Sequence, residues 1–202
     1  VVDTGSNPAN TFPMRDRIER GEIRGPRILS VGAPLYPKDG IPFYLSDLPP
    51  ELLSQLSQPG EAAEATQLVR ANLESGADAT KLFIATPQAD DSVKYMAREV
   101  ARAAAEESHA RGKLVMAHPT DTAGMNAILD AKVDIAAHTT IGRSSAWSPE
   151  LIRKLVAARV AVVPTVKLWG YEVDKNKVPA EVQRRLVDGA LKEVKAFSDA
   201  GG

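Results

Sequence analysis

Short apolar runs alternate with longer amphipathic segments along most of this chain. Most of the runs are apolar on both faces, which is typical of strands buried in a parallel sheet. The segments between them repeat apolar positions with helical spacing, and Gly21, Gly76 and Gly112 stand where the first three predicted helices end. This alternation predicts an α/β fold assembled from βαβ crossovers. The predicted strands are residues 1–3, 27–31, 79–84, 113–117, 133–137 and 159–163, and the predicted helices are 13–20, 61–74, 92–111, 122–131, 149–158 and 179–197.

Candidate helix caps and two inserts complete the predicted order of elements. Ser92, Thr122 and Ser148 have side chains that favour N-cap positions. Residues 31–60 interrupt the alternation with six prolines and three aromatic residues, and a long loop after a strand often shapes a pocket. A disordered excursion on the surface is the alternative for this segment. Residues 170–178, after the last predicted strand, form a second insert.

Composition narrows the class of protein and its partners. With 202 residues, 44% of them hydrophobic, the chain is expected to form one domain over residues 1–202. The net charge of -1, with acidic and basic residues interspersed, predicts no nucleic-acid partner. No membrane partner is expected either, because no apolar run is long enough to span a bilayer. The absence of cysteine leaves histidine, carboxylate or a modified lysine as ligands for any metal.

Both ends of the sequence are unusual for a complete domain. Residues 1–5 read as the end of a strand already under way, and the chain stops at Gly202 after a helix, where another strand is expected. We therefore expect the sequence to be a piece of a longer protein, and it indicates no cellular location.

Three polar residues stand at the ends of successive apolar runs: Lys81, His118 and His138. If these runs are neighbouring parallel strands of a barrel, the three side chains converge at its carboxyl end, where such barrels place their chemistry. The two histidines share the same phase of the strand alternation, so both point to one side of the sheet. Taken singly, each histidine is more often a hydrogen-bonded structural residue than a ligand. His109, by contrast, lies in a charged helical segment and is expected to be a solvated surface residue.

Lys81 is the most unusual of the three, because it stands inside the apolar run 79–84. Burying an unpaired ammonium costs several kcal/mol, and desolvation lowers its pKa toward neutrality. A neutral amine can add carbon dioxide or form a Schiff base. A salt bridge to a carboxylate elsewhere in the chain is the structural alternative.

These residues and their surroundings resemble the metal-dependent amidohydrolase superfamily, in particular the branch of imidazolonepropionase and bacterial Xaa-Pro dipeptidases. The resemblance covers essentially the whole chain. It implies a TIM-like (β/α)8 barrel of which strands 2–7 are present and strands 1 and 8 are missing, with one or two divalent metals, usually zinc, at the carboxyl end. The segments that carry the resemblance are residues 2–5, 21–28 and 76–81, together with His118 and His138.

The resemblance also implies roles for the three residues. Lys81 is similar to the lysine that is carboxylated and bridges two metals in the binuclear members, and His118 and His138 are similar to the ligands of the second metal. The His-X-His pair of the first strand has no counterpart in this sequence. The Asp of the eighth strand, which shuttles protons in the family, is expected to lie beyond Gly202. No catalytic residue is therefore assigned, and we expect the chain by itself to be inactive.

For the complete protein, the resemblance implies hydrolysis of a C–N bond in an amide, a cyclic amide or a peptide-like substrate. Residues that follow predicted strand ends are the candidates for lining the substrate pocket: Tyr36, Thr120, Thr139, Thr165, Lys167 and Trp169. Any of them can equally serve loop packing. Without strands 1 and 8 the sheet has two open edges, so self-association through residues 1–3 and 160–163 is expected, and a stable monomer at high concentration would contradict it.

Two other functions stay open at this point. A Schiff-base lyase would use Lys81 as its nucleophile and need no metal, and borohydride trapping of a carbonyl ligand would favour it. A degenerate barrel kept as a binding module would be no enzyme at all. Full-length protein that holds no zinc, manganese, iron or cobalt after supplementation would support that third interpretation.

Overall fold

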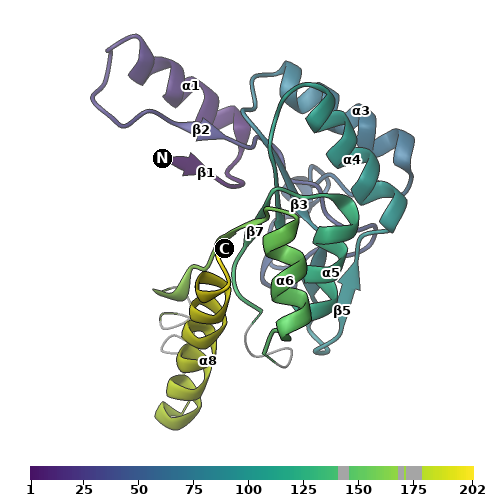
Figure 1. Cartoon of the computed structure of the whole chain (residues 1–202). Helices are drawn as coiled ribbons and strands as arrows, with labels where there is room; N and C mark the ends of the chain where they lie inside the picture. Colours follow the sequence, from purple (N-terminus) through teal and green to yellow (C-terminus); the bar gives the residue numbers. More distant parts are fainter. Residues whose placement is uncertain (141–145, 168–170, 172–178) are drawn as a thin grey trace.

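The computed structural model describes residues 1–140, 146–167, 171 and 179–202. Strands and helices alternate in a mixed α/β arrangement, as the sequence predicts (Figure 1). The strands are β1 (Val2–Asp3), β2 (Leu29–Ser30), β3 (Thr80–Phe83), β4 (Ala85–Pro87), β5 (Val93–Tyr95), β6 (Val115–His118), β7 (Ile135–Ala137) and β8 (Ala161–Val163). The helices are α1 (Pro8–Glu19), the 3-10 turn η1 (Phe43–Leu45), α2 (Pro50–Leu53), α3 (Ala62–Glu74), α4 (Arg98–Ala110), α5 (Thr122–Ala131), α6 (Pro149–Ala157) and α8 (Ala180–Asp199).

The parallel strands follow one another in chain order. β1 pairs with β2, and a four-stranded sheet has the order β3-β6-β7-β8. Leu35, in the segment after β2, pairs with β3, because its N–H donates to the carbonyl of Lys81 at 2.9 Å and its own carbonyl accepts from Phe83 at 2.8 Å. Within the described residues the sheet does not close into a barrel, and the outer edges of β1 and β8 have no strand partner. The assignment to strands 2–7 of a barrel and the self-association through these edges stay predictions.

Strand register separates the two faces of the sheet. Lys81 pairs with Met116, and Phe83 pairs with His118, so these four side chains lie on one face. The alternate positions, Leu82 among them, are fully buried under the helices. Helices α3, α4, α5 and α6 lie side by side over that second face (Figure 1). The main apolar core is therefore on the helical side, and the opposite face carries Lys81 and His118 together with Met116 and Phe83.

The predicted helix 92–111 is wrong at its start. Residues 93–95 form β5, which pairs antiparallel with β4, and α4 begins only at Arg98 with Ala97 as its N-cap. The hydroxyl of Ser92 donates to the Asp90 carboxylate at 2.6 Å, so it stabilises the hairpin turn and caps no helix. A β-branched residue and an aromatic one at positions 93 and 95 favour the strand.

Other helix boundaries shift by a few residues. α1 begins at Pro8, five residues before the predicted start, because the Asn7 side chain accepts from Ala9 N–H and caps it. Asp121, rather than Thr122, caps α5. Ser148 caps α6 as predicted. Positive φ values confirm the three predicted glycine helix ends: 73° at Gly21, 111° at Gly76 and 67° at Gly112.

The proline-rich insert 31–60 is an integral part of the fold and no disordered excursion. Val31, Leu35 and Tyr36 are buried, and the Asn72 side chain of α3 donates to the Val31 carbonyl at 2.7 Å. Gly32 has a φ of 64°, and a Cβ there would clash with the Asn72 side-chain oxygen. The second predicted insert, 170–178, lies outside the described residues except for Tyr171.

The β4–β5 hairpin packs against this insert and against the loop after β6. The Thr86 hydroxyl donates to the Gly40 carbonyl at 2.7 Å, which ties the hairpin to the insert. The Tyr95 hydroxyl donates to Asp121, and the Thr120 hydroxyl donates to the Ala85 carbonyl at 2.8 Å. The insert 31–60 and the β4–β5 hairpin thus form one connected wall at the carboxyl end of β3. The sequence did not predict this hairpin.

A buried carboxylate anchors α8 to the loop that follows β7. Glu193 is 5% exposed and accepts hydrogen bonds from the backbone of Thr140 and Trp147. The Trp147 indole N–H donates to the Thr140 hydroxyl at 2.8 Å, and its ring packs edge-on against Phe197 of α8. Burial raises the pKa of Glu193 to about 7, although these hydrogen bonds oppose the rise.

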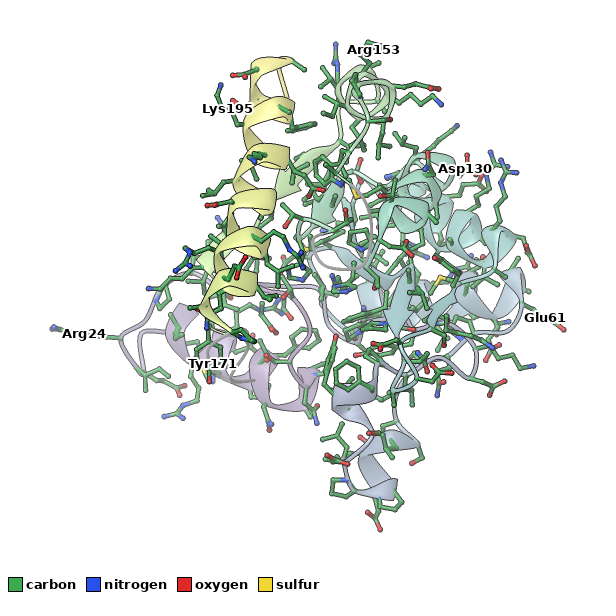
Figure 2. The ribbon with its side chains drawn as sticks, turned by 90° about the horizontal axis from the view of Figure 1, so that it is seen from below. Arg24, Glu61, Asp130, Arg153, Tyr171 and Lys195 are labelled. Carbon is green, nitrogen blue, oxygen red and sulfur yellow. The ribbon has the colours of Figure 1, made fainter. Side chains whose placement is uncertain are left out.

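Charged side chains of both signs lie on the periphery. Arg24, Glu61, Asp130, Arg153 and Lys195 all stand at the outer margin in Figure 2. None of the described helices combines the length and the apolar character that crossing a membrane requires.

Replacing Leu82 by alanine is expected to lower the free energy of unfolding by about 2 to 5 kcal/mol, because the side chain is fully buried in the core and its loss leaves a cavity. Leu114→Ala is the matched control, since Leu114 is 54% exposed, and its effect should stay within about 0.5 kcal/mol. Urea unfolding followed by circular dichroism measures both. Equal effects of the two substitutions would contradict the described register of β3.

Glu193 is expected to make stability depend on pH in the neutral range. Its pKa is about 7 in the folded chain and near the ordinary 4.5 when unfolded, so its contribution is fully present below pH 4.5 and is lost as pH rises through 7. Glu193→Gln should flatten the fall in stability between pH 5 and 8. Urea midpoints of both proteins across this range measure the difference, and parallel curves would show that Glu193 does not titrate there.

Candidate metal and active site

The structure brings Lys81, His118 and His138 to the same rim of the sheet. His118 ends β6 and His138 follows β7, and the centroids of their rings lie 4.8 Å apart at an interplanar angle of 66°. Lys81 lies on β3, with its Nζ 4.9 Å from the centroid of the Phe83 ring, and that ring stacks on His118 at 5.2 Å. The predicted convergence of the three side chains is therefore present, while their role as metal ligands stays a prediction.

Lys81 is held in the sheet without a countercharge. The side chain is 3% exposed, and no described carboxylate forms an ion pair with it, so the salt-bridge alternative has no support among the described residues. Burial lowers the pKa of Lys81 from 10.5 to about 7. A substantial fraction of this amine is then neutral and nucleophilic at physiological pH.

Both imidazoles are also held in the neutral form. Burial, together with the nearby Lys81 and His138, lowers the pKa of His118 well below its usual value. Burial and Lys81 lower the pKa of His138 to about 4. Neutral imidazoles are the form that binds metal ions. Two neutral imidazoles and a partly neutral amine thus lie close together in a poorly solvated site.

A hydroxyl fixes the orientation of His138. Its Nδ1 lies 2.6 Å from the Thr165 hydroxyl oxygen, and its backbone N–H donates to the Val163 carbonyl at 2.8 Å. The backbone φ of His138 is 85°, an unusual value for a residue with a side chain. Because Nδ1 is occupied, Nε2 is the nitrogen left for a ligand.

Of the residues predicted to line the substrate pocket, Tyr36 and Thr120 differ in their positions relative to the site. Tyr36 is buried and stacks on Phe83 at 4.6 Å, which places it in the site. The Thr120 hydroxyl, by contrast, is used by the Ala85 carbonyl.

Three further candidates follow β7 and β8. Thr139 is buried beside His138, and Lys167 is exposed. Trp169 lies outside the described residues. His109 is exposed, as predicted, and pairs with Asp134 at 2.9 Å.

Gly202, beyond which the resemblance places the proton-shuttling Asp, lies just after the C-cap of α8. Gly202 is exposed, and its N–H donates to the carbonyl of Phe197 at 3.0 Å. A Cβ at Gly202 would clash with the Phe197 ring, so the glycine lets the backbone lie close to that side chain. This contact is structural and gives Gly202 no catalytic role. The location of the Asp and the inactivity of the chain by itself stay predictions.

Sequence patterns missed two residues of the site. Phe83 lies between Tyr36 and His118 in a continuous stack of three rings, but a phenylalanine in an apolar run looks like an ordinary core residue. Glu193 anchors the loop that carries His138, but a glutamate in an amphipathic helix looks solvated. An inward-facing aromatic two residues after Lys81 was the only signal available for the first, and none existed for the second.

A cavity of about 280 Å³ opens beside this stack. We call it the aromatic cavity, and it is bounded by residues 3–6 after β1, by Pro34, Tyr36, Tyr44 and Leu45 of the insert, and by Phe83. Phe83 lines the cavity and also stacks on His118. The cavity and the ring stack beside the histidines therefore share Phe83.

The donor set fits a divalent metal only if Lys81 takes part. Among the described residues, no three His, Cys, Asp and Glu side chains lie close enough together to hold a metal ion. The two neutral imidazoles, whose ring centroids lie 4.8 Å apart, would supply two of the ligands. A carbamate on Lys81 would supply oxygen ligands and replace a costly cation by an anion.

Comparison with known proteins gives matches in structure only. No family model matches the sequence, and no curated protein matches it. A protein described as a prolidase from Bifidobacterium longum has a TM-score of 0.74 and 26% sequence identity, and the match covers 99% of this chain and 49% of that one. A Xaa-Pro dipeptidase with methionine bound in its active site has a TM-score of 0.73 and 20% identity over 98% of this chain and 50% of that one.

Ochratoxinase from A. niger has a TM-score of 0.76 and 20% identity, and the match covers 92% of this chain and 47% of the ochratoxinase. Likeness at this identity concerns the fold alone. The chain spans about half the length of the solved structures it matches. These neighbours are amidohydrolase-family proteins, so the resemblance found in the sequence is shown by the structure, and the chain has the fold of about half of such a protein.

Proposed function

We propose that the complete protein hydrolyses a C–N bond of an amide, cyclic amide or peptide-like substrate with the help of a divalent metal, zinc in the first place. The observation that carries this proposal is a buried amine without a described countercharge that faces two neutral imidazoles. Lys81, His118 and His138 are the proposed ligands. The structural neighbours support hydrolysis in general, since they include a prolidase, a Xaa-Pro dipeptidase and a molinate hydrolase.

Lys81 is proposed to act as a carbamate. Its neutral nitrogen attacks carbon dioxide, an N–C bond forms, and one proton leaves to solvent. The product is an anion with two oxygen atoms where a cation was costly to bury. The low pKa of this amine, about 7, provides the neutral nitrogen that the addition needs.

The remaining groups orient ligands and substrate. Thr165 holds Nδ1 of His138 and so directs Nε2 toward the site. When bound, a divalent metal supplies Lewis acidity, which polarises a substrate carbonyl and makes water nucleophilic near neutral pH. Phe83, with Tyr36 stacked on it, covers one side of His118 and excludes water there, which strengthens electrostatic interactions at that histidine.

A specific observation also favours the second candidate, a Schiff-base lyase. A buried lysine whose pKa is about 7 is as well suited to attack a substrate carbonyl as to add carbon dioxide. The two functions differ in their need for metal, and the tests below separate them.

Removing either histidine is expected to weaken zinc binding by the full-length protein at least tenfold, because each supplies a neutral nitrogen ligand. Thr165→Val should weaken it about ten- to hundredfold through the loss of orientation. Bound zinc is measured by mass spectrometry after equilibrium dialysis of the His118→Ala, His138→Ala and Thr165→Val proteins.

His109→Ala is the matched control, since His109 binds Asp134 on the helical side of the sheet, and its zinc content should equal that of the parent. Equal zinc content in all four variants would refute the assignment of the ligands. A parent protein that retains no metal would refute metal dependence.

The carbamate is expected to form above pH 7 and to disappear below it, because protonation removes the nucleophilic lone pair of Lys81. Carbon-13 NMR of full-length protein in labelled bicarbonate, with zinc present, follows its signal from pH 6 to 8.5. Lys81→Ala should abolish the signal and Lys38→Ala should leave it unchanged. Borohydride trapping of a carbonyl compound on Lys81, with no carbamate signal, would decide for the Schiff-base lyase.

A further inference from the structure

Most of the wall of the aromatic cavity is apolar. Pro34, Tyr36, Tyr44, Leu45 and Phe83 form this apolar part, and no Lys, Arg or His is among the described residues that line the cavity. Burial raises the pKa of Tyr36 to about 12, so its hydroxyl stays neutral throughout the physiological range. A cavity with this lining favours an apolar group and gives no cationic partner to a carboxylate.

The single acidic residue at the cavity is already satisfied by the chain. Asp3 accepts hydrogen bonds from Gly5 N–H at 3.3 Å, from Ser6 N–H at 2.9 Å and from the Ser30 hydroxyl at 3.0 Å. Hydrogen bonds from these groups hold its pKa below the ordinary value although burial opposes them. Since the carboxylate is engaged by its own loop, it does not prepare the cavity for a cationic ligand.

The size of the cavity suits a ring or a branched chain. An apolar cavity of about 150 Å³ is large enough for benzene, and the aromatic cavity measures about 280 Å³. A second cavity of about 230 Å³ shares Tyr36 and Leu45 with it and continues along Leu48, Leu52 and Leu56. The insert 31–60 therefore offers an apolar groove that is longer than a single ring.

The groove leads to the proposed ligands. Tyr36 stacks on Phe83, and Phe83 stacks on His118, with centroid distances of 4.6 and 5.2 Å. A group in the cavity that contacts Phe83 thus touches a ring that itself stacks on His118. A substrate that places its amide at the histidines can place a neighbouring group in the cavity.

We propose that the aromatic cavity and its leucine-lined extension bind a bulky uncharged group, aromatic or branched aliphatic, that flanks the scissile C–N bond of the substrate. That this ligand is the substrate rests on the proposed function. The chemical class of the ligand follows from the cavity alone. The insert 31–60 is then the segment that determines specificity for that group.

Binding of small amides to full-length protein, with metal removed by a chelator, tests the cavity apart from the reaction. N-acetyl-L-phenylalaninamide and N-acetyl-L-leucinamide are expected to bind at least about tenfold more tightly than N-acetylglycinamide and N-acetyl-L-lysinamide, measured as dissociation constants by NMR titration. The factor reflects burial of one apolar side chain. Equal binding of the phenylalanine and lysine amides would overturn the proposal.

Leu45→Glu places a charge in the cavity wall and should abolish the preference for phenylalanine over glycine. Phe43→Glu is the matched control, because Phe43 belongs to the same turn, is 46% exposed and does not line the cavity, so the preference should persist. Leu45→Trp, which fills the cavity without a charge, gives the same test if Leu45→Glu fails to fold. A preference unchanged in the Leu45 variants would place the binding site elsewhere and overturn the proposal.

Amide binding and amide hydrolysis by metal-loaded full-length protein distinguish the cavity proposal from the proposed function. A preserved preference in binding without hydrolysis of any amide would contradict the proposed function and leave the ligand class intact. Hydrolysis that proceeds equally well on glycine and phenylalanine amides would overturn the cavity as a substrate site and leave the hydrolase intact.

Discussion

Burial of the Lys81 amine is the constraint on which the site depends. An ammonium in this position would cost several kcal/mol without an anion, and the described residues provide none. The chain meets this cost by shifting the amine toward its neutral form and by surrounding it with two neutral imidazoles. This arrangement of a partly neutral amine beside two neutral imidazoles is the basis of the metal and carbamate roles proposed for the three residues.

The register of the parallel strands brings the two histidines to the rim where Lys81 is buried. Phe83 lies opposite His118 in the pairing of β3 with β6, and β7 brings His138 beside it. A slip by one residue would move Lys81 to the helical face, where Leu82 is buried. The helical core that fixes this register therefore also fixes the positions of the three nitrogen groups.

The segments outside the βα units shape what the site can bind. The insert 31–60 and the β4–β5 hairpin are joined through Thr86 and Gly40 and form a wall beside the three-ring stack. On the other side, Thr165 and Glu193 hold His138 and the loop after it from the last βα unit. Rigid strands thus place the nitrogen groups, while loops tied to one another set their surroundings.

The amino-acid sequence by itself determined the order of the parallel strands, the glycine helix ends and the rim positions of Lys81, His118 and His138, because strand alternation and apolar runs are local properties. It failed at residues 92–95, where a strand and the first turn of a helix have similar apolar spacing. Only the tertiary structure decided the ring stack through Phe83, the anchoring by Glu193 and the cavity against the insert. Each of these depends on contacts between residues far apart in the chain, and a side chain's polarity at one position does not indicate whether water or a distant backbone group will satisfy it.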